Sequence, residues 1–291
     1  MKINHIYQGN AIQVSSQLED SSIQSIITSP PYYRQRNYSE EENENEIGRE
    51  NSIQDYLDNL VETFNRLRPK LKDNGLLWVN LGDKYIDKEL QGIPWKFALL
   101  MKDNGWKLRS DVIWMKPNAM PSSVKNRPTT DHEYVFMFAK TNEYFYNADA
   151  IREEHVTFSE NFKMKGGRNH FGKRGGTPEG GKNQGDTNLH DARWDQAFHP
   201  LGRNKRTVWN IPVSRFKGAH FAVFPPKLVE TCLLASTEEE DIVLDPFMGS
   251  GTTGVVALLN NRKYIGIDLY PEYVELTEKR IKEECQQIRL L

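Results

Sequence analysis

The sequence predicts an α/β fold with a mostly parallel central sheet and helices on both of its faces. Short apolar runs, such as Ile23 to Ile27 and Ile242 to Leu244, alternate with segments whose apolar residues repeat at helical spacing. The second run leads through a glycine turn, Asp245 to Thr253, into a helix-like run. A strand, a glycine turn and a helix in this order form a nucleotide-binding corner at the carboxyl edge of a parallel sheet.

The first part of the chain contains two predicted strands and a helix. Lys2 to Gly9 predicts a strand, and the apolar run before Pro30 predicts a buried one, because proline has no N–H for the ladder and must end it. A helix should begin after Ser52, because Ser52 and Asp55 together resemble a capping pair. Its apolar residues repeat at helical spacing, namely Ile53, Leu57, Leu60, Val61, Phe64 and Leu67.

The remaining elements follow from the same patterns. Residues 76–81 predict a central strand, and residues 111–115 and 134–139 predict an antiparallel pair at the sheet edge. Further strands are expected at residues 208–211 and 264–267. Helices are expected at residues 94–101, 227–235, 255–259 and 271–288.

Composition limits the class of protein. The 291 residues fit one large α/β domain or two small ones, and 37% hydrophobic residues allow a core despite a mean hydropathy of −0.69. No signal peptide and no apolar run of about 18 residues are found, so we expect a cytoplasmic protein. Cys232 and Cys285 lie in helix-like runs, which argues against a disulfide framework or a zinc site, and no metal is expected.

The segment Thr28 to Tyr33 carries groups suited to a flat, amino-bearing ring. Its prolines should make it leave the sheet as a rigid, extended turn. Ser29 and the Pro30 carbonyl can each accept a hydrogen bond from one N–H of an exocyclic amine, while the Tyr32 ring stacks on the base. The alternative is an ordinary proline-rich turn with a surface tyrosine.

The glycine turn predicts a nucleoside site. Asp268 ends the next apolar strand about 20 residues after Gly249, a spacing that places a carboxylate at ribose hydroxyls. A dinucleotide-dependent oxidoreductase is the rival interpretation. Gly249 and Gly251 are followed by Gly254 only in a threonine-rich context, and the proline–tyrosine segment has no role in hydride transfer.

Together the two motifs resemble the amino-group DNA methyltransferases that use S-adenosylmethionine, over nearly the whole chain. The Ser29-Pro30-Pro31-Tyr32 motif comes first and the motif from Phe247 to Gly251 comes last, which is the circularly permuted order of the beta group. The resemblance implies a Rossmann-like methyltransferase fold. Other stretches that look like the same family are residues 75–83, 114–118, 132–140 and 220–228.

The resemblance implies a role for each matching residue. Ser29, Pro30, Pro31 and Tyr32 would be catalytic. The cofactor would be bound by Asn10, Thr28, His220, Asp245, Phe247, Gly249, Ser250, Gly251, Thr252, Thr253 and Asp268. Where this chain has Asn10, family members usually have an Asp that lies near the adenine of the cofactor. Asn10 therefore either has that position or is an ordinary asparagine in a strand-to-helix turn.

Residues 160–206 differ from the rest in composition, being rich in Gly, Asn, Lys and Arg. They are either a flexible insertion with a solvated face or, as their position in the beta group implies, a target-recognition region. We expect a catalytic part at 1–155, this insertion at 156–206 and a cofactor-binding part at 207–291. The expected DNA contacts are Arg36, Lys163, Lys165, Arg168, Lys173, Arg174, Lys182, Arg203, Lys205 and Arg206.

The expected function is methyl transfer to N4 of a flipped-out cytosine in double-stranded DNA, within a restriction-modification system with a separate endonuclease. In the family, Ser at position 29 occurs mostly in cytosine-N4 enzymes, whereas adenine-N6 enzymes more often have Asp or Asn. Adenine N6 is the main alternative. A non-catalytic DNA-binding protein and a methyltransferase for RNA or protein amides are the others. The net charge of −2 argues against a nucleic-acid partner unless basic side chains gather on one face.

Overall fold

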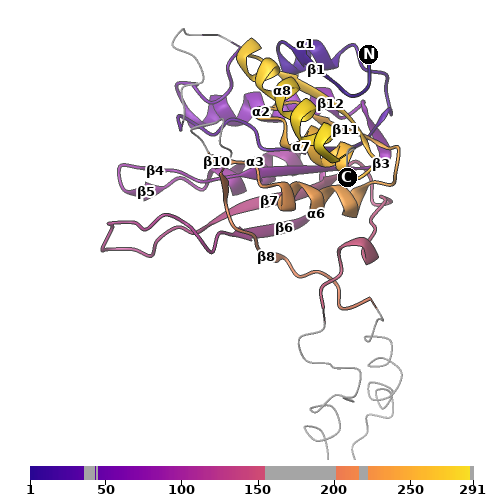
Figure 1. Ribbon diagram of the computed structural model, residues 1–291. Coiled ribbons are helices and arrows are strands. Elements are labelled where there is room, and N and C mark those ends of the chain that lie inside the picture. The colour runs from indigo at the N-terminus through magenta and orange to yellow at the C-terminus, as the bar shows by residue number, and fades with distance from the viewer. Residues whose placement is uncertain (36–42, 44, 155–200, 216–221, 289–291) are drawn as a thin grey trace, which may run out of the picture. The chain divides into compact units, whose positions relative to one another are not determined.

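The computed structural model describes residues 1–35, 43, 45–154, 201–215 and 222–288 (Figure 1). The chain divides into two compact units. The first comprises Met1–Asn147 with Thr207–Leu291, and the second comprises Ala148–Arg206.

The first unit is built on a mixed sheet, whose described strands follow the order β1-β12-β11-β2-β3-β7-β6-β8. Strands β1, β12, β11, β2 and β3 are parallel, and β7 runs antiparallel to both β3 and β6. The strands are β1 (His5–Gln8), β2 (Ile23–Thr28), β3 (Leu71–Leu81), β6 (Lys107–Met115), β7 (His132–Ala139), β8 (Val208–Asn210), β11 (Ile242–Asp245) and β12 (Lys263–Asp268).

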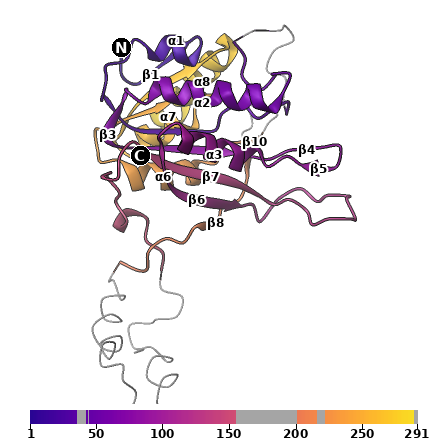
Figure 2. The same ribbon diagram turned by 180° about the vertical axis from the view of Figure 1, so that it is seen from behind.

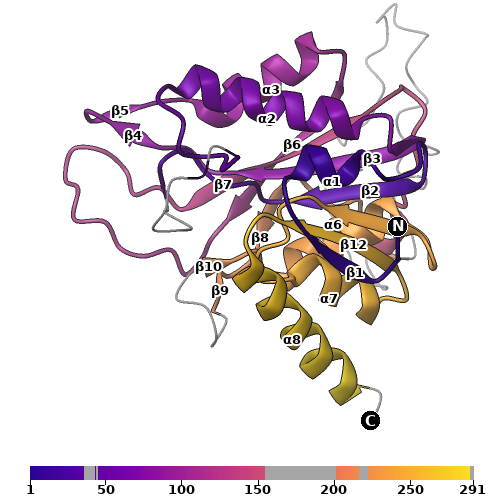
Figure 3. The same cartoon turned by 90° about the horizontal axis from the view of Figure 1, so that it is seen from above.

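Helices cover both faces of this sheet, as predicted (Figure 3). One face carries α1 (Ala11–Ser15), α2 (Ile53–Leu67) and α3 (Ile93–Asp103). The other carries α6 (Pro226–Ser236), α7 (Thr252–Leu259) and α8 (Pro271–Ile288). The predicted cap of α2 is confirmed, because the Asp55 backbone N–H donates to Ser52 Oγ at 3.1 Å.

The predicted antiparallel pair is confirmed as β6 and β7, but it does not form the sheet edge. The short strand β8 pairs in parallel with β6 outside it. Two tryptophans account for this position. Trp114 Nε1 donates to the Ile211 carbonyl at 2.7 Å, and the Trp209 ring lies 6.1 Å from that of Trp78.

Two small hairpins were not predicted. Strands β4 (Tyr85–Ile86) and β5 (Glu89–Leu90) form one, and Figure 2 shows it projecting from the first unit. The Arg127 guanidinium lies 3.6 Å from the centre of the Tyr85 ring, so the loop between β6 and β7 packs on this hairpin. Strands β9 (Ser214–Arg215) and β10 (Ala222–Val223) form the other.

An aromatic core fixes α2 and α3 to the sheet. Phe64 of α2 and Phe97 of α3 are fully buried, and their rings lie 5.7 Å apart. The Phe97 ring also meets that of Phe138 on β7 edge-on at 6.0 Å. Burying one such side chain stabilises a fold by about 1.5–3 kcal/mol, so the strands that carry the site rest on a rigid support.

In the second unit, the described part consists of two short segments joined by an ionic cluster. A 3₁₀ turn, η1 (Asp149–Ile151), is followed by Glu153, which forms a bridge with Arg203.

Across the residues that the structure describes, no helix is both long and apolar enough to cross a membrane. Cys232 is buried and Cys285 is partly exposed, and no disulfide joins them.

Candidate active site

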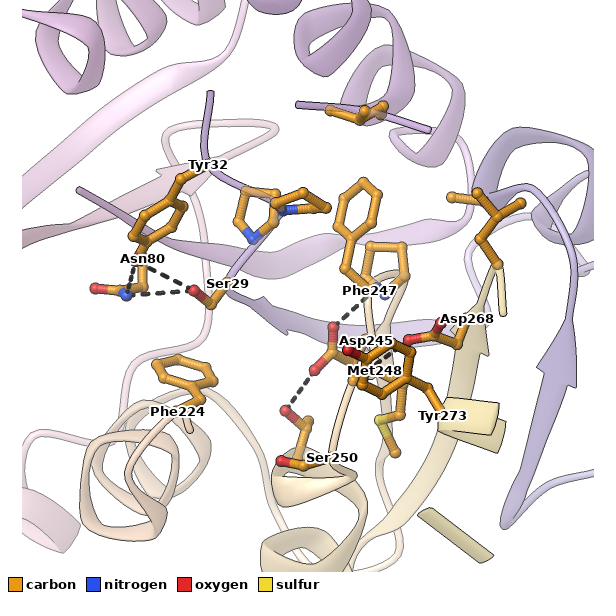
Figure 4. Close-up of a pocket in the computed structure, with 18 of the residues that line it drawn as sticks. Ser29, Tyr32, Asn80, Phe224, Asp245, Phe247, Met248, Ser250, Asp268 and Tyr273 are labelled. Atoms are coloured by element: carbon orange, nitrogen blue, oxygen red, sulfur yellow. Dashed lines mark hydrogen bonds between the residues drawn. The ribbon is translucent and has the colours of Figure 1, made fainter. Parts of the chain in front are cut away.

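The site lies where the connections of the sheet diverge. Strands β11 and β2 are neighbours, but the chain continues from β11 to β12 on one side and from β2 to β3 on the other. Ligands of such open sheets bind beyond the carboxyl ends of the strands at this point. A cavity of about 340 Å³ lies there, lined by both sequence motifs (Figure 4).

The Ser29 turn is held in place from two sides. Thr28, the last residue of β2, is fully buried, and its hydroxyl donates to Asp245 Oδ1 at 2.6 Å. On the helix side, the Tyr56 hydroxyl donates to the Pro31 carbonyl at 2.8 Å. Ser29, Pro30, Pro31 and Tyr32 all line the cavity.

Asp245 joins the two motifs, which are more than 200 residues apart in the chain. Its Oδ1 accepts from the Thr28 hydroxyl and from the Phe247 N–H at 3.1 Å, and its Oδ2 accepts from the Thr253 hydroxyl at 2.7 Å. Burial raises the pKa of this carboxyl to about 6, although the hydrogen bonds oppose the shift. Asp245 therefore fixes the Ser29 turn against the glycine turn.

The glycine turn is also held by Asp268 and α8. Asp268 Oδ2 accepts from the Gly249 N–H at 2.7 Å, and Oδ1 accepts from the Tyr270 N–H at 3.1 Å. Burial raises the pKa of the Asp268 carboxyl to about 6. From α8, the Thr277 hydroxyl donates to the Gly249 carbonyl at 2.8 Å. The turn is therefore arranged before any ligand arrives.

Most of the predicted cofactor residues converge on the cavity, and Figure 4 shows how they gather around it. Those that line it are Asn10, Asp245, Phe247, Gly249, Ser250, Thr252, Thr253 and Asp268. Thr28 and Gly251 are not among the lining residues. Thr28 supports Asp245 from behind, and Gly251 packs against Thr277.

Asn10 is the N-cap of α1. Its Oδ1 accepts from the backbone N–H of Ile12 at 2.9 Å and of Gln13 at 3.3 Å. The side chain thus has the local role expected of an asparagine in a strand-to-helix turn, while the residue still lines the cavity.

A polar cluster beside Tyr32 was missed by sequence reasoning. It consists of Tyr32, Asn80 on β3, Glu133 on β7 and Lys116 after β6, and all four line the cavity. Tyr32 Oη donates to Glu133 Oε2 at 2.7 Å, and Asn80 Nδ2 donates to Tyr32 Oη at 2.7 Å. Lys116 Nζ donates to Glu133 Oε1. Burial, and after it the charge of Glu133, raises the pKa of Tyr32 well above its ordinary value, so this phenol stays protonated.

The sequence does contain a signal for this cluster. Asn80 directly follows the apolar run 76–79 of β3, and Glu133 directly precedes the apolar run 134–139 of β7. Asn80 is 2% exposed, and a polar side chain at such a depth needs partners. The partner of each residue, however, lies on a different strand and could not be read from either run alone.

The predicted DNA contacts fall in two groups. Arg36, Lys163, Lys165, Arg168, Lys173, Arg174 and Lys182 lie outside the described residues, as does His220 of the cofactor set. Of the others, Arg203 and Lys205 pair with Glu153 at 3.2 and 3.3 Å within the second unit. Their charge is therefore partly compensated, and Arg206 follows in the same segment.

The cavity has the chemistry of a nucleoside and base site. Gly249 lines it, and a Cβ added there would meet no atom closer than the Phe247 carbonyl oxygen at 3.9 Å, so this stretch of backbone can approach a ligand. Phe247, Tyr270 and Tyr273 supply aromatic faces, and Asp268 supplies a carboxylate. On the other side, Ser29 and the Pro30 carbonyl offer acceptors to an amine.

Known proteins that are similar to this chain point to the same family. Residues 23–279 match the family described as DNA methylase. The chain is 38% identical to the type II methyltransferase M.Cfr9I of Citrobacter freundii, and the alignment covers 98% of this chain and 90% of that protein.

Solved structures share the fold. PvuII DNA methyltransferase (cytosine-N4-specific) has a TM-score of 0.66 at 22% identity, with 97% of this chain and 91% of that chain covered. The M1.HpyAVI–SAM complex has a TM-score of 0.56 at 20% identity, with 95% and 98% covered. Since the family match spans most of the sequence, the resemblance drawn from the two motifs is confirmed, and the chain belongs to the DNA methylase family.

Proposed function

We propose that this chain methylates N4 of cytosine in double-stranded DNA. The observation that carries the proposal is the position of Ser29, with Pro30 and Tyr32, in one cavity with the glycine turn and Asp268. S-adenosylmethionine is the methyl donor, and when bound it supplies an electrophilic methyl group on a sulfonium. Phe247, the glycine turn and Asp268 would hold it.

The residues of the catalytic turn would bind and orient the target base. A stacked base cannot reach the cavity, so it must leave the helix. The amine would donate one hydrogen to Ser29 Oγ and the other to the Pro30 carbonyl, while the ring stacks on Tyr32. Two acceptors on its hydrogens localise the nitrogen lone pair, which otherwise spreads into the ring. The chain's contribution is therefore positioning and electrostatics.

Cytosine is favoured over adenine by Ser29 itself. In the amino-group DNA methyltransferases that the two motifs resemble, serine at this position occurs mostly in cytosine-N4 enzymes. PvuII DNA methyltransferase, which shares the fold, is named as cytosine-N4-specific. The hydroxyl is a neutral acceptor, and it can accept from the amine of either base. Adenine N6 is therefore the alternative target.

Two partners belong to the proposal. Duplex DNA would be bound through the basic side chains of residues 160–206, whose composition matches phosphates and guanine edges. Because several relatives are named type II methyltransferases, we place the chain in a restriction-modification system with a separate endonuclease.

The test is identification of the methylated atom. The full chain is incubated with methyl-labelled S-adenosylmethionine and duplex DNA of mixed sequence, and the digested product is analysed by mass spectrometry. N4-methylcytosine is expected. N6-methyladenine without N4-methylcytosine would contradict the choice of base, and C5-methylcytosine would contradict the mechanism as well. Methylation-aware sequencing of DNA from expressing cells then gives the recognition site.

A further inference from the structure

A continuous hydrogen-bonded path runs from Ser29 to a carboxylate. Ser29 Oγ lies 3.3 Å from Tyr32 Oη, which lies 2.7 Å from Glu133 Oε2. The methyl-transfer site described above uses Ser29 and the Tyr32 ring but gives no role to Glu133. A carboxylate that is mostly shielded from solvent and lies two hydrogen bonds from Ser29 needs an explanation, because desolvating a charge is unfavourable unless it is compensated.

The direction of this path is fixed by the amide of Asn80. Its Nδ2 lies 2.8 Å from Glu133 Oε2, and an ionised carboxylate only accepts hydrogen bonds, so the nitrogen and not the oxygen must face it. The same Nδ2 donates to Tyr32 Oη. Tyr32 therefore cannot donate to Asn80, and its single proton goes to Glu133.

The Ser29 hydroxyl must then donate to Tyr32. The phenol accepts from Asn80 and Ser29 and donates to Glu133, which uses its full hydrogen-bonding capacity. The two N–H groups of Asn80 go to the closer partners, so its 3.4 Å contact with Ser29 Oγ is weak. Ser29 Oγ thus keeps a lone pair for an amine in the cavity.

Lys116 completes the arrangement at the far end. Its ammonium donates to Glu133 Oε1 and lies 4.5 Å from the centre of the Trp114 ring. The pair is largely shielded, with 18% of the Lys116 side chain and 16% of the Glu133 side chain exposed. The ammonium compensates the negative charge on one oxygen and leaves Oε2 to Tyr32 and Asn80.

We propose that Glu133 receives the proton that the target amine loses, through Ser29 and Tyr32. This inference rests on the proposed function, in which Ser29 faces the amine, and it holds for cytosine N4 and adenine N6 alike. A serine hydroxyl is a weak base by itself. It can remove a proton from an amine only if its own proton moves on, and this path gives that proton a destination.

The step balances in atoms and charge. The amine nitrogen bonds the methyl carbon with its own electron pair, and the pair of the broken carbon–sulfur bond stays on sulfur. One amine proton moves to Ser29 Oγ, the Ser29 proton to Tyr32 Oη, and the Tyr32 proton to Glu133 Oε2. Ser29 and Tyr32 end neutral and Glu133 ends protonated, to be restored by loss of the proton to solvent.

The kinetic test compares variants of the path in single-turnover methylation. Glu133→Gln and Tyr32→Phe should each slow the step by roughly 10²-fold, and the double variant should be no slower than the slower single one. Asp131→Asn makes the same carboxylate-to-amide change two residues away, on a half-exposed side chain outside the path, and should react at the wild-type rate. Added formate should raise the single-turnover rate of the Glu133→Ala variant at least tenfold.

A second readout does not depend on activity. With ¹³C-labelled tyrosine, the Tyr32 Cζ resonance, identified by its loss in Tyr32→Phe, should shift in Glu133→Gln and not in Asp131→Asn. Calorimetry with S-adenosylmethionine should give unchanged affinity for the Glu133 variants, because Glu133 belongs to the base side of the cavity.

Failure of the relay and failure of the proposed function are distinguishable. If the wild-type protein methylates DNA while Glu133→Gln reacts at the same rate, the relay is wrong. A slow Glu133→Ala that formate does not restore would also overturn it, as would a Tyr32 resonance that does not move in Glu133→Gln. If the wild-type protein methylates no DNA, the proposed function itself fails.

Discussion

In the proposed function, the chemistry of this cavity depends on Ser29, whose side chain is a neutral hydroxyl. Compared with a carboxylate it is a weaker acceptor, so its position relative to Tyr32 and Asn80 has to supply what charge does not. The hydrogen bond from the Thr28 hydroxyl to Asp245 Oδ1, just before Ser29 in the chain, fixes that position. For a single residue such as Ser29, the proposed function depends on where an ordinary hydroxyl is placed.

The Ser29→Ala change removes one acceptor for the amine without altering the glycine turn or Asp268, so turnover should fall by roughly 10²-fold or more. S-adenosylmethionine affinity, measured by calorimetry, should stay within twofold of wild type. A variant that turns over at the wild-type rate would remove Ser29 from the catalytic set.

Asp245 links stability to pH. Its pKa is raised to about 6 in the folded protein, against about 3.9 for an unfolded aspartate. The folded state therefore binds more protons between these values, and its contribution to stability, full below pH ~4, is lost as the pH rises through ~6. Asp268 has a raised pKa as well and acts in the same direction.

Asp245→Asn should remove this contribution. The amide can still accept from the Thr28 hydroxyl, and it no longer titrates. From pH 4 to pH 7, the free energy of unfolding of the wild type should fall relative to the variant by on the order of 2 kcal/mol. Urea denaturation of both proteins at four pH values measures the difference. Curves that run parallel over this range would contradict the assignment.

Among the elements, the glycine turn before α7 shows most directly how local geometry builds the site. Gly249 and Gly251 both have positive φ, +52° and +81°, a region that other residues enter at a cost of roughly 1–2 kcal/mol. Their surroundings differ. A Cβ on Gly251 would lie 2.6 Å from Thr277 Cγ2, whereas Gly249 has no atom closer than 3.9 Å.

This contrast predicts unequal effects of two matched variants. Gly251→Ala should reduce the free energy of unfolding by about 1–3 kcal/mol more than Gly249→Ala, because only Gly251→Ala also forces α8 away. Adding Thr277→Ser, which removes Cγ2 and keeps the hydroxyl bonded to the Gly249 carbonyl, should recover part of the loss. Denaturant titrations of the three variants give the comparison. Equal losses for both alanine variants would refute the proposed clash with α8.

For the whole molecule, the central question is how a chain of net charge −2 binds DNA. Charge distribution decides this more than the sum. Arg203 and Lys205 share Glu153, so the described part of the second unit is not strongly basic by itself. The proposal therefore assigns most phosphate contacts to residues 160–206, which lie largely outside the described part.

The salt dependence of DNA binding tests this assignment. Deleting residues 165–182, or changing their five basic residues to Gln at constant length, should reduce the slope of log K against log salt by up to about 4. Site preference should be lost as well, while S-adenosylmethionine binding persists. Fluorescence anisotropy with specific and random duplexes at several salt concentrations measures both effects. Unchanged site preference in either variant would show that another segment reads the sequence.

The sequence by itself determined most of the helices and strands and the two motifs. Prolines after Ile27 end a strand, Ser52 caps a helix, and the glycine turn follows β11, and each of these signals acts over a few residues. Local sterics and backbone hydrogen bonding decide such features, so they could be predicted directly. The family followed from the two motifs because their order along the chain is itself sequence information.

Only the tertiary structure decided which residues support the two motifs and which others join them in the site. The contacts of Thr28 with Asp245 and of Tyr32 with Glu133 join positions 217 and 101 residues apart. The pairing of β3, β7 and β6 places Asn80, Glu133 and Lys116 together, and β8 extends the sheet beyond the predicted edge. Strand order and register arise from packing of the whole core, and no periodicity within one segment encodes them.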